Sequence, residues 1–279
     1  AADWFAARGC AYTVWEAGIG GRLDPVKLIA AQRVALTALD FEHTALLGGT
    51  LEAIALEKIA AAPAGAELFV SEAAASAGSP VRAAVQSYCT EHGVHGSFVA
   101  ETERRSPLSG AYQQSNAALA VALARALTPL SEAQIARGLA ATRWPGRLEV
   151  LSDDPLVVID VGHTPDGVAR ALKGFQALRG ARGAVLVCGV SADKDAAAIV
   201  EQLAPSFHHI ICAAAAHKGA SPASIAAHVQ RANPAAEITL ADLCIVACSE
   251  AFRGNGEVVA TGVGPIPRLA AGLAKLTHS

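Results

Sequence analysis

The sequence predicts a two-domain α/β protein, and three observations carry this prediction. From about residue 146 onward, apolar β-type runs alternate with Ala- and Leu-rich segments of helical length, as expected of a mainly parallel sheet covered by helices. The 279 residues, 52% of them hydrophobic, suffice for two modest cores. The stretch "RWPGR" at 143–147 breaks the pattern with Pro and Gly, so we expect domains at 1–145 and 146–279.

The first half is predicted to be a less regular α/β arrangement, with strands and helices distinguished by their hydrophobic periods. The expected strands are "TVWEAG" (13–18), "RVALTAL" (33–39) and "AELFVSE" (66–72). The expected helices are 48–61, with Leu51, Ile54, Ala55 and Ile59 on one face, and the serine-capped segments 115–127 and 131–142.

The second half is predicted to be a Rossmann-like domain with four strands. These are "LVVID" (156–160), "AVLVCGV" (184–190), "HHIICAA" (208–214) and "EVVATG" (257–262). Helical segments that start near Asp, Ser or Pro and stop at Gly or Pro lie between them, at 165–180, 193–205, 221–234 and 241–254.

Charge and cysteine usage exclude several classes of protein. The net charge of -3 gives no basic field for nucleic acid. No apolar run approaches the roughly 18 residues of a membrane helix, and no signal peptide is recognisable at the start. The six cysteines lack metal-site spacing and mostly lie in apolar runs, so we expect buried, reduced thiols in a cytoplasmic protein.

The segment "VWEAGIGGRLD" (14–24) is the first candidate for chemistry. A carboxylate at a strand end, Glu16, is followed by glycines that let backbone amides approach a ligand. Glu16 is therefore a candidate ligand for a hard cation such as Mg²⁺, although the same residues also fit a tight turn that binds no ligand. His43 and, fifteen residues later, Lys58 form a second candidate group, although each alone also fits a turn histidine or a solvated helix lysine.

Six ordered blocks extend these two groups over nearly the whole chain. They are "EAGIGGRLD" (16–24), "FEHTALLGGTLEAIALEKIA" (41–60), "LSGAYQQSNAALA" (108–120), "WPGRLEV" (144–150), "IDVGHTP" (159–165) and "GVSADKD" (189–195). In that order they resemble the folylpolyglutamate synthase/dihydrofolate synthase branch of the Mur ligase superfamily. The resemblance implies that residues 1–145 are part of the central ATPase domain and that 146–279 form the Rossmann-like C-terminal ligase domain.

The resemblance also implies an activity. Members of this family use ATP and Mg²⁺ to convert a folate-type acid, such as dihydropteroate or a reduced folate, into an acyl phosphate that reacts with the amine of glutamate. Such a ligase works mainly by positioning and by electrostatic stabilisation.

Site residues carried over from the family fall in both halves. Glu16 and His43 would ligate the metal, and Lys58 would be the lysine that the family carbamylates. Asn116 and Arg147 would contact the nucleotide. The catalytic set would be completed by Asp160 and His163, on the loop that closes over the active site, whereas "DKD" (193–195) would be structural or near the substrate.

One family element is missing and supports a second hypothesis. The ATPase domain of the family starts with a glycine-rich phosphate loop that ends in Gly-Lys-Ser/Thr, and this chain contains no Gly-Lys dipeptide and no methionine. We therefore expect a missing N-terminal segment or a partner chain to supply the loop. The alternative is a degenerate, non-catalytic relative that binds a ligand or partner, which replacements such as Glu42 and Thr164 in the family blocks would also fit.

Two other enzyme classes fit the sequence less well. A Rossmann oxidoreductase would rest on fold analogy alone, because "GIGGRL" and "GVGPIP" are incomplete dinucleotide fingerprints. A serine hydrolase would need a GxSxG elbow, and "GVSAD" lacks its second glycine.

Overall fold

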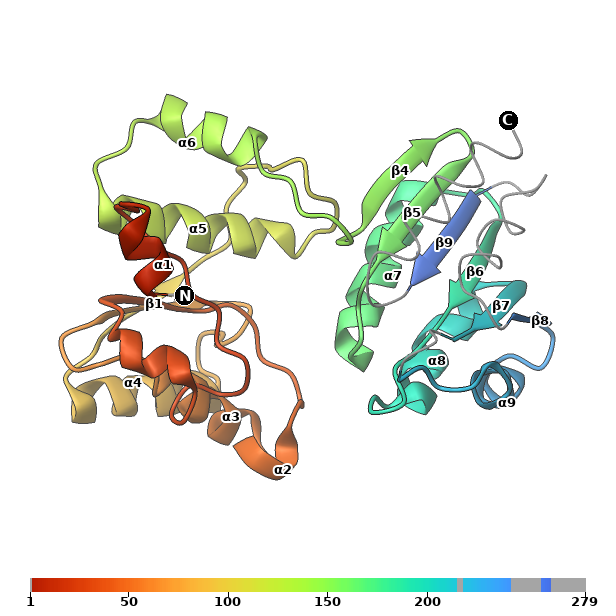
Figure 1. Cartoon of the computed structure of the whole chain (residues 1–279), viewed down its shortest axis with the longest axis horizontal. Helices are drawn as coiled ribbons and strands as arrows, with labels where there is room; N and C mark the ends of the chain where they lie inside the picture. Colours follow the sequence, from red (N-terminus) through yellow and green to blue (C-terminus); the bar gives the residue numbers. More distant parts are fainter. Residues whose placement is uncertain (1, 215–217, 242–256, 262–279) are drawn as a thin grey trace. The chain divides into compact units, whose positions relative to one another are not determined.

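The computed structural model describes residues 2–214, 218–241 and 257–261, which divide into two compact α/β units (Figure 1). Unit 1 comprises Ala1–Arg105 and Gln114–Arg137, and unit 2 comprises Ser106–Gln113 and Gly138–Ser279. The short segment Ser106–Gln113 thus belongs to unit 2 although unit 1 surrounds it in the sequence. No helix among the described residues is long and apolar enough to cross a membrane.

Unit 1 is built on a small parallel sheet in the order β1-β2-β3. Its elements are α1 (Ala2–Ala7), η1 (Pro25–Ile29), β1 (Arg33–Leu36), α2 (Thr44–Leu47), α3 (Leu51–Ile59), β2 (Glu67–Ser71), α4 (Pro80–His92), β3 (His95–Val99), α5 (Gln113–Leu127) and α6 (Glu132–Ala140). Helices α3 and α4 pack against each other and against the sheet. The predicted inner face of α3 is confirmed, because Ile54, Ala55 and Ile59 are buried there.

Unit 2 is a six-stranded sheet in the order β4-β5-β9-β6-β7-β8, in which the pairing of β4 with β5 is antiparallel and all other pairings are parallel. Its elements are β4 (Glu149–Asp153), β5 (Leu156–Asp160), α7 (Pro165–Arg179), β6 (Ala184–Cys188), α8 (Ala196–Leu203), η2 (Ala204–Ser206), β7 (His209–Ala213), α9 (Pro222–Ala232), β8 (Glu237–Ala241) and β9 (Glu257–Thr261). The crossovers through α7, α8 and α9 run in one direction across the sheet, so these helices pack side by side in one core.

The Rossmann-like prediction for the second half is confirmed as an α/β sheet domain, and all four predicted strands are present as β5, β6, β7 and β9. Strands β5 and β6 are buried along their whole length, which explains their continuous apolar sequences. The helix expected at 241–254 lies outside the described residues, apart from Ala241, which ends β8. Besides the short elements α1, η1, α2 and η2, the elements α4, β3, β4 and β8 were not predicted.

The strand predicted at 13–18 is wrong. The structure has no regular secondary structure there, and Val14 is 94% exposed. Among the described strands, β1 is hydrogen-bonded to β2 alone. A β-prone segment without a ladder partner leaves its backbone groups to water, so propensity alone does not make it a strand.

The cysteine prediction holds for three of the four cysteines in the described residues. Cys89, Cys188 and Cys212 are buried and free, whereas Cys10 is free but exposed because α1 buries no residue near it. Burial raises the pKa of Cys212 to about 11, so this thiol is unreactive at neutral pH. Cys244 and Cys248 lie outside the described residues.

Candidate functional site

The glycine-rich segment of unit 1 is a closed loop organised by Asp24. One carboxylate oxygen of Asp24 accepts hydrogen bonds from the amides of Gly18 and Ile19, at 2.9 and 3.3 Å. The other oxygen accepts from the Val26 amide at 2.9 Å and caps η1. The Val26 hydrogen bond is the main cause of the lowered pKa of Asp24, and the other two amides add to it. The aspartate of the "GGRLD" motif therefore acts on the backbone of its own loop.

The loop packs on helices α2 and α3, and these contacts explain two of its glycines. A Cβ atom at Gly21 would stand 2.2 Å from the carbonyl oxygen of Lys58, and one at Gly20 would stand 2.9 Å from the Leu47 side chain. Gly20 also has a φ of 66°, in the left-handed region that side chains disfavour. Any larger residue would push the loop away from the helix that carries Lys58.

Arg22 joins the loop to the same helix turn. Its amide donates to the carbonyl oxygen of Glu57 at 3.0 Å, and its guanidinium makes a two-point contact with the Glu57 carboxylate. The "GGRLD" and "EK" blocks, which are far apart in the sequence, thus meet in unit 1.

Lys58 is paired with Glu42, the residue before His43. The ammonium Nζ lies 3.0 Å from Glu42 Oε1, in a partly buried position. His43 is exposed and has a φ of 51°, and it precedes α2 without a side-chain capping bond. The structure therefore brings the predicted residues His43 and Lys58 into one neighbourhood through Glu42. Carbamylation of Lys58 stays a prediction.

Glu16 is exposed and makes no hydrogen bond or ion pair with the described part of the chain. Among the residues that the structure describes, no group of three or more His, Cys, Asp or Glu side chains is close enough to hold a metal ion. The described His, Cys, Asp and Glu side chains therefore do not form a complete metal-binding site by themselves. The exposed carboxylate of Glu16 is an oxygen ligand of the kind that Mg²⁺ takes together with water and substrate phosphates. That Glu16 and His43 share a metal stays a prediction.

The second group of predicted residues lies in unit 2, at the C-terminal end of β5. Asp160 is buried, and its two carboxylate oxygens accept hydrogen bonds from the amides of Leu148 and Gly162, at 2.9 and 2.7 Å. Burial raises the pKa of Asp160, and these amides together with the nearby charges of Arg147 and His163 oppose the rise. Asp160 thus fastens the loop after β5 to the start of β4.

His163 and Arg147 share this neighbourhood. The Nδ1 atom of His163 lies 3.2 Å from the carbonyl oxygen of Val161, so an Nδ1–H tautomer would leave Nε2 free to accept. Arg147 is partly buried and acts electrostatically on Asp160 and on Tyr112, a residue of the inserted segment Ser106–Gln113. Burial, together with the Asp160 charge, raises the pKa of Tyr112.

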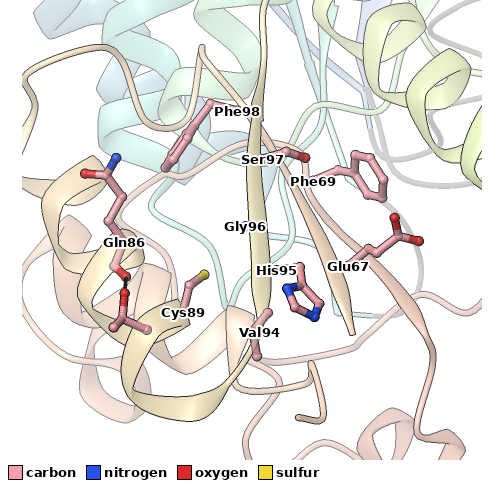
Figure 2. Close-up of a pocket in the computed structure, with 10 residues that line it drawn as sticks. Glu67, Phe69, Gln86, Cys89, Val94, His95, Gly96, Ser97 and Phe98 are labelled. Carbon is pink, nitrogen blue, oxygen red and sulfur yellow. Dashed lines mark hydrogen bonds between the residues drawn. The ribbon is translucent and has the colours of Figure 1, made fainter. Parts of the chain in front are cut away.

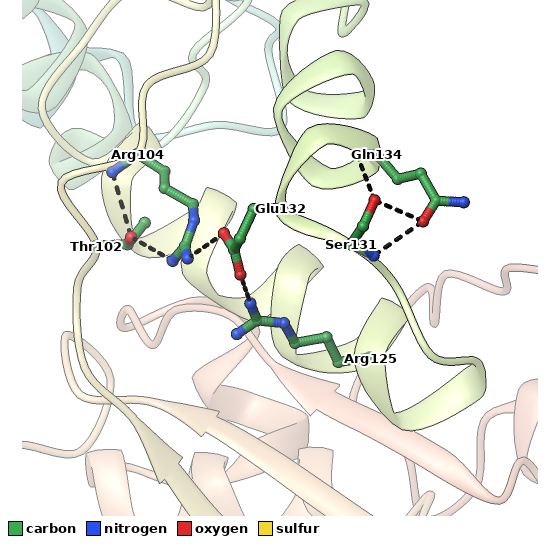
Figure 3. A network of polar contacts seen from close by, with 6 residues as sticks. All are labelled: Thr102, Arg104, Arg125, Ser131, Glu132 and Gln134. Atoms are coloured by element: carbon green, nitrogen blue, oxygen red, sulfur yellow. Dashed lines mark hydrogen bonds and ion pairs between the residues drawn. The ribbon is translucent and has the colours of Figure 1, made fainter.

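The remaining candidates are less closely tied to these groups. Asn116 is exposed on α5 in unit 1, whereas Arg147 belongs to unit 2. In the "DKD" block, Asp195 caps α8 by accepting from the Ala198 amide at 3.0 Å, which fits the first of the two roles expected there, structural or near the substrate. The loop after β3 is tied to the α5–α6 hairpin by a surface network in which Glu132 contacts Arg104 and Arg125 (Figure 3).

Sequence reasoning missed three contributors: Asp24, the Arg22–Glu57 pair and Tyr112. An aspartate just after a glycine turn and before Pro is a recognisable capping signal, so Asp24 could have been found. The Arg22–Glu57 pair and Tyr112 depend on contacts between segments that are distant in the sequence, and a local sequence pattern does not predict such contacts.

A pocket lies away from both groups, beside the edge strand β3. Its volume is about 730 Å³, and Figure 2 shows Gln86 and Cys89 of α4 on one side of β3 and Glu67 and Phe69 of β2 on the other. None of the predicted site residues lines it.

Comparison with known proteins identifies the class. Residues 146–263 match the family model "Mur ligase, glutamate ligase domain". Folylpolyglutamate synthase of Lacticaseibacillus casei is 32% identical over 73% of this chain and 54% of its own length. A protein of Haloferax volcanii named "Probable bifunctional folylpolyglutamate synthase/dihydropteroate synthase" is 35% identical over 84% of this chain and 31% of its own length. The chain therefore spans between about a third and about half of these curated relatives.

Solved structures agree on the fold. Mycobacterium tuberculosis folylpolyglutamate synthase complexed with ADP superposes with a TM-score of 0.85 over 99% of this chain and 70% of that chain, at 21% identity. Together the matches place the chain among the Mur ligases. Within that superfamily it belongs to the folylpolyglutamate synthase/dihydrofolate synthase family, of which it covers the C-terminal part.

Proposed function

We propose that this chain is the C-terminal part of an ATP-dependent ligase that adds glutamate to a folate-type acid through an acyl phosphate. The observation that carries the proposal is the docking of the Glu16 loop on helix α3, which brings the "GGRLD" and "EHT…EK" blocks together in one unit. The relatives are named as synthases, and a bifunctional folylpolyglutamate synthase/dihydrofolate synthase with Mn, AMPPNP and L-glutamate bound shares the fold with a TM-score of 0.75. The non-catalytic alternative has no support among them.

In unit 1 we assign the metal to Glu16 and His43. A bound Mg²⁺ would neutralise phosphate charge in the reaction. Glu16 has no competing partner among the described residues, and His43 is exposed, so both are available to a ligand. Lys58 forms an ion pair with Glu42 at this site, and we assign it as the lysine that is carbamylated. Asn116 is assigned to the nucleotide.

In unit 2 we assign contact with the reactants to His163 and Arg147. The buried carboxylate of Asp160 is already committed to two backbone amides, so its role is to hold the loop that carries His163. We accordingly propose Asp160 as a positioning residue. Dihydropteroate and a reduced folate both remain candidate acids, because no described residue discriminates between them.

The test begins with the natural polypeptide. Its intact mass and its coding sequence should reveal a longer product, or a partner chain, that carries a Gly-Lys-Ser/Thr loop. That protein should release ADP only when ATP, Mg²⁺, glutamate and a folate-type acid are all present. His43→Ala should abolish this release, whereas the remote variant Arg104→Ala should keep it. ADP release that does not depend on any folate-type acid would exclude the proposed reaction.

A further inference from the structure

The contact between Arg22 and Glu57 is unusual for a surface ion pair because it involves both main chain and side chains. The Arg22 amide donates to the Glu57 carbonyl oxygen at 3.0 Å. The guanidinium Nε lies 3.1 Å from Glu57 Oε2, and Nη2 lies 2.6 Å from Oε1. Such a fork fixes the orientation of the two groups as well as their distance.

The pair connects the two segments that carry the candidate metal ligands. Glu57 directly precedes Lys58, whose ammonium is 3.0 Å from Glu42, the neighbour of His43. On the other side, Arg22 belongs to the loop in which Asp24 holds the amides of Gly18 and Ile19, just after Glu16. One continuous series of contacts thus runs from the Glu16 loop to the segment of His43.

The pair contributes little to overall stability. The Arg22 side chain is 59% exposed and that of Glu57 is 22% exposed, and ion pairs with an exposed partner are worth little because water and salt screen them. The Arg22 amide bond and the close approach of Gly21 would keep the loop near α3 without the side chains. What the fork adds is a fixed orientation of the loop.

We propose that Arg22 and Glu57 are positioning residues that set Glu16 relative to the His43–Lys58 segment. The inference rests on the proposed role of Glu16 and His43 as metal ligands. Neither Arg22 nor Glu57 touches the metal in this assignment; they act through the loop and the helix that carry the ligands. The competing explanation is that the pair only joins two surface segments. Its loss would then change the free energy of unfolding and leave the metal affinity unchanged.

The test titrates the full chain with Mn²⁺ alone and follows free Mn²⁺ by electron paramagnetic resonance. Glu16→Gln in the wild-type background shows whether binding occurs at this site. Arg22→Ala and Glu57→Ala should each raise the Mn²⁺ concentration at half saturation by about tenfold, as loss of partners behind metal ligands commonly does. The exchanged pair Arg22→Glu with Glu57→Arg should recover most of this affinity. Arg104→Ala, which breaks an exposed pair elsewhere in unit 1, should leave it unchanged.

Hydrogen exchange of the peptide that contains residues 16–24 gives a second measurement. It should become faster in Arg22→Ala and return to the wild-type rate in the exchanged pair. Unchanged Mn²⁺ affinity in Arg22→Ala and Glu57→Ala, with wild type binding at Glu16, would overturn the positioning role alone. A wild-type chain that binds no Mn²⁺, or binds it equally well as Glu16→Gln, would overturn the metal assignment and the inference together.

Discussion

The carboxylates of the two units differ in what they bind. In unit 1, Glu16 is exposed and free of partners among the described residues, and the loop around it is held by Asp24 and by the Arg22–Glu57 pair. In unit 2, Asp160 is buried and both of its oxygens are occupied by backbone amides. Both residues lie in blocks that resemble the same enzyme family, yet of the two only Glu16 has no protein partner on its carboxylate among the described residues.

The surroundings of a carboxylate thus indicate whether it can bind a ligand or whether it holds other parts of the chain in position. A carboxylate that satisfies buried amides is costly to remove from the fold, whereas an exposed one can be removed with little effect on stability. Stability and ligand binding should therefore respond in opposite ways to substitutions in the two units.

The largest expected effect is on Asp160. Asp160→Ala leaves the buried amide of Leu148 and the partly buried amide of Gly162 without an acceptor, so it should lower the free energy of unfolding by about 3 kcal/mol. Asp160→Asn keeps one acceptor oxygen and should lose less. Urea denaturation measures both. If Asp160→Ala unfolds at the same urea concentration as wild type, the buried carboxylate is not a structural anchor and the contrast with Glu16 fails.

A smaller loss is expected where the loop of unit 1 meets α3. The new Cβ of Gly21→Ala would stand 2.2 Å from the Lys58 carbonyl oxygen, and the resulting displacement should lower the free energy of unfolding by about 2 kcal/mol. Gly49→Ala is a matched control, because a Cβ there meets no atom within 4 Å. Thermal unfolding of the two variants should differ clearly; equal midpoints would contradict the docked loop.

The inserted segment of unit 2 gives a pH-dependent test. Burial raises the pKa of Tyr112, so the neutral phenol is favoured in the folded chain. The stabilisation of the folded chain by the neutral Tyr112 phenol is complete below the ordinary tyrosine pKa of 10.0. It is lost as the pH rises through the raised pKa of Tyr112 in the folded chain. Absorbance at 295 nm should show that Tyr112→Phe removes a component that titrates above pH 10. Loss of a component that titrates at or below that pH would place Tyr112 in solvent.

The smallest effect is expected for the surface network of Figure 3. Hydrogen bonding to Arg104 lowers the pKa of Glu132, but the network is exposed and screened. Arg104→Ala should therefore shift the midpoint of thermal unfolding by less than about 1 °C, and less still at high salt. A shift as large as that of Gly21→Ala would show that exposed pairs hold unit 1 together more strongly than its loop packing does.

Several features of the candidate site could be predicted from the sequence. The blocks that contain Glu16, His43, Lys58 and Asp160 were found from residue types and from the order in which the blocks resemble the family, although the strand expected to end near Glu16 is absent. The pairing partners could not be predicted in this way. Glu57 lies 35 positions from Arg22, and Leu148 lies 12 positions from Asp160, so each contact depends on how separate elements pack.

The sequence by itself determined the α/β class, the family and the existence of four strands, predicted at 156–160, 184–190, 208–214 and 257–262 and present as β5, β6, β7 and β9. Apolar period, helix caps and motif order are properties of the local chain. Only the tertiary structure decided that 13–18 is not a strand, that Ser106–Gln113 joins unit 2 and that Asp160 serves the backbone. The physical reason is that strand pairing, burial and hydrogen-bond partners are set by groups distant in sequence, and these fix which polar side chains stay free to bind a ligand.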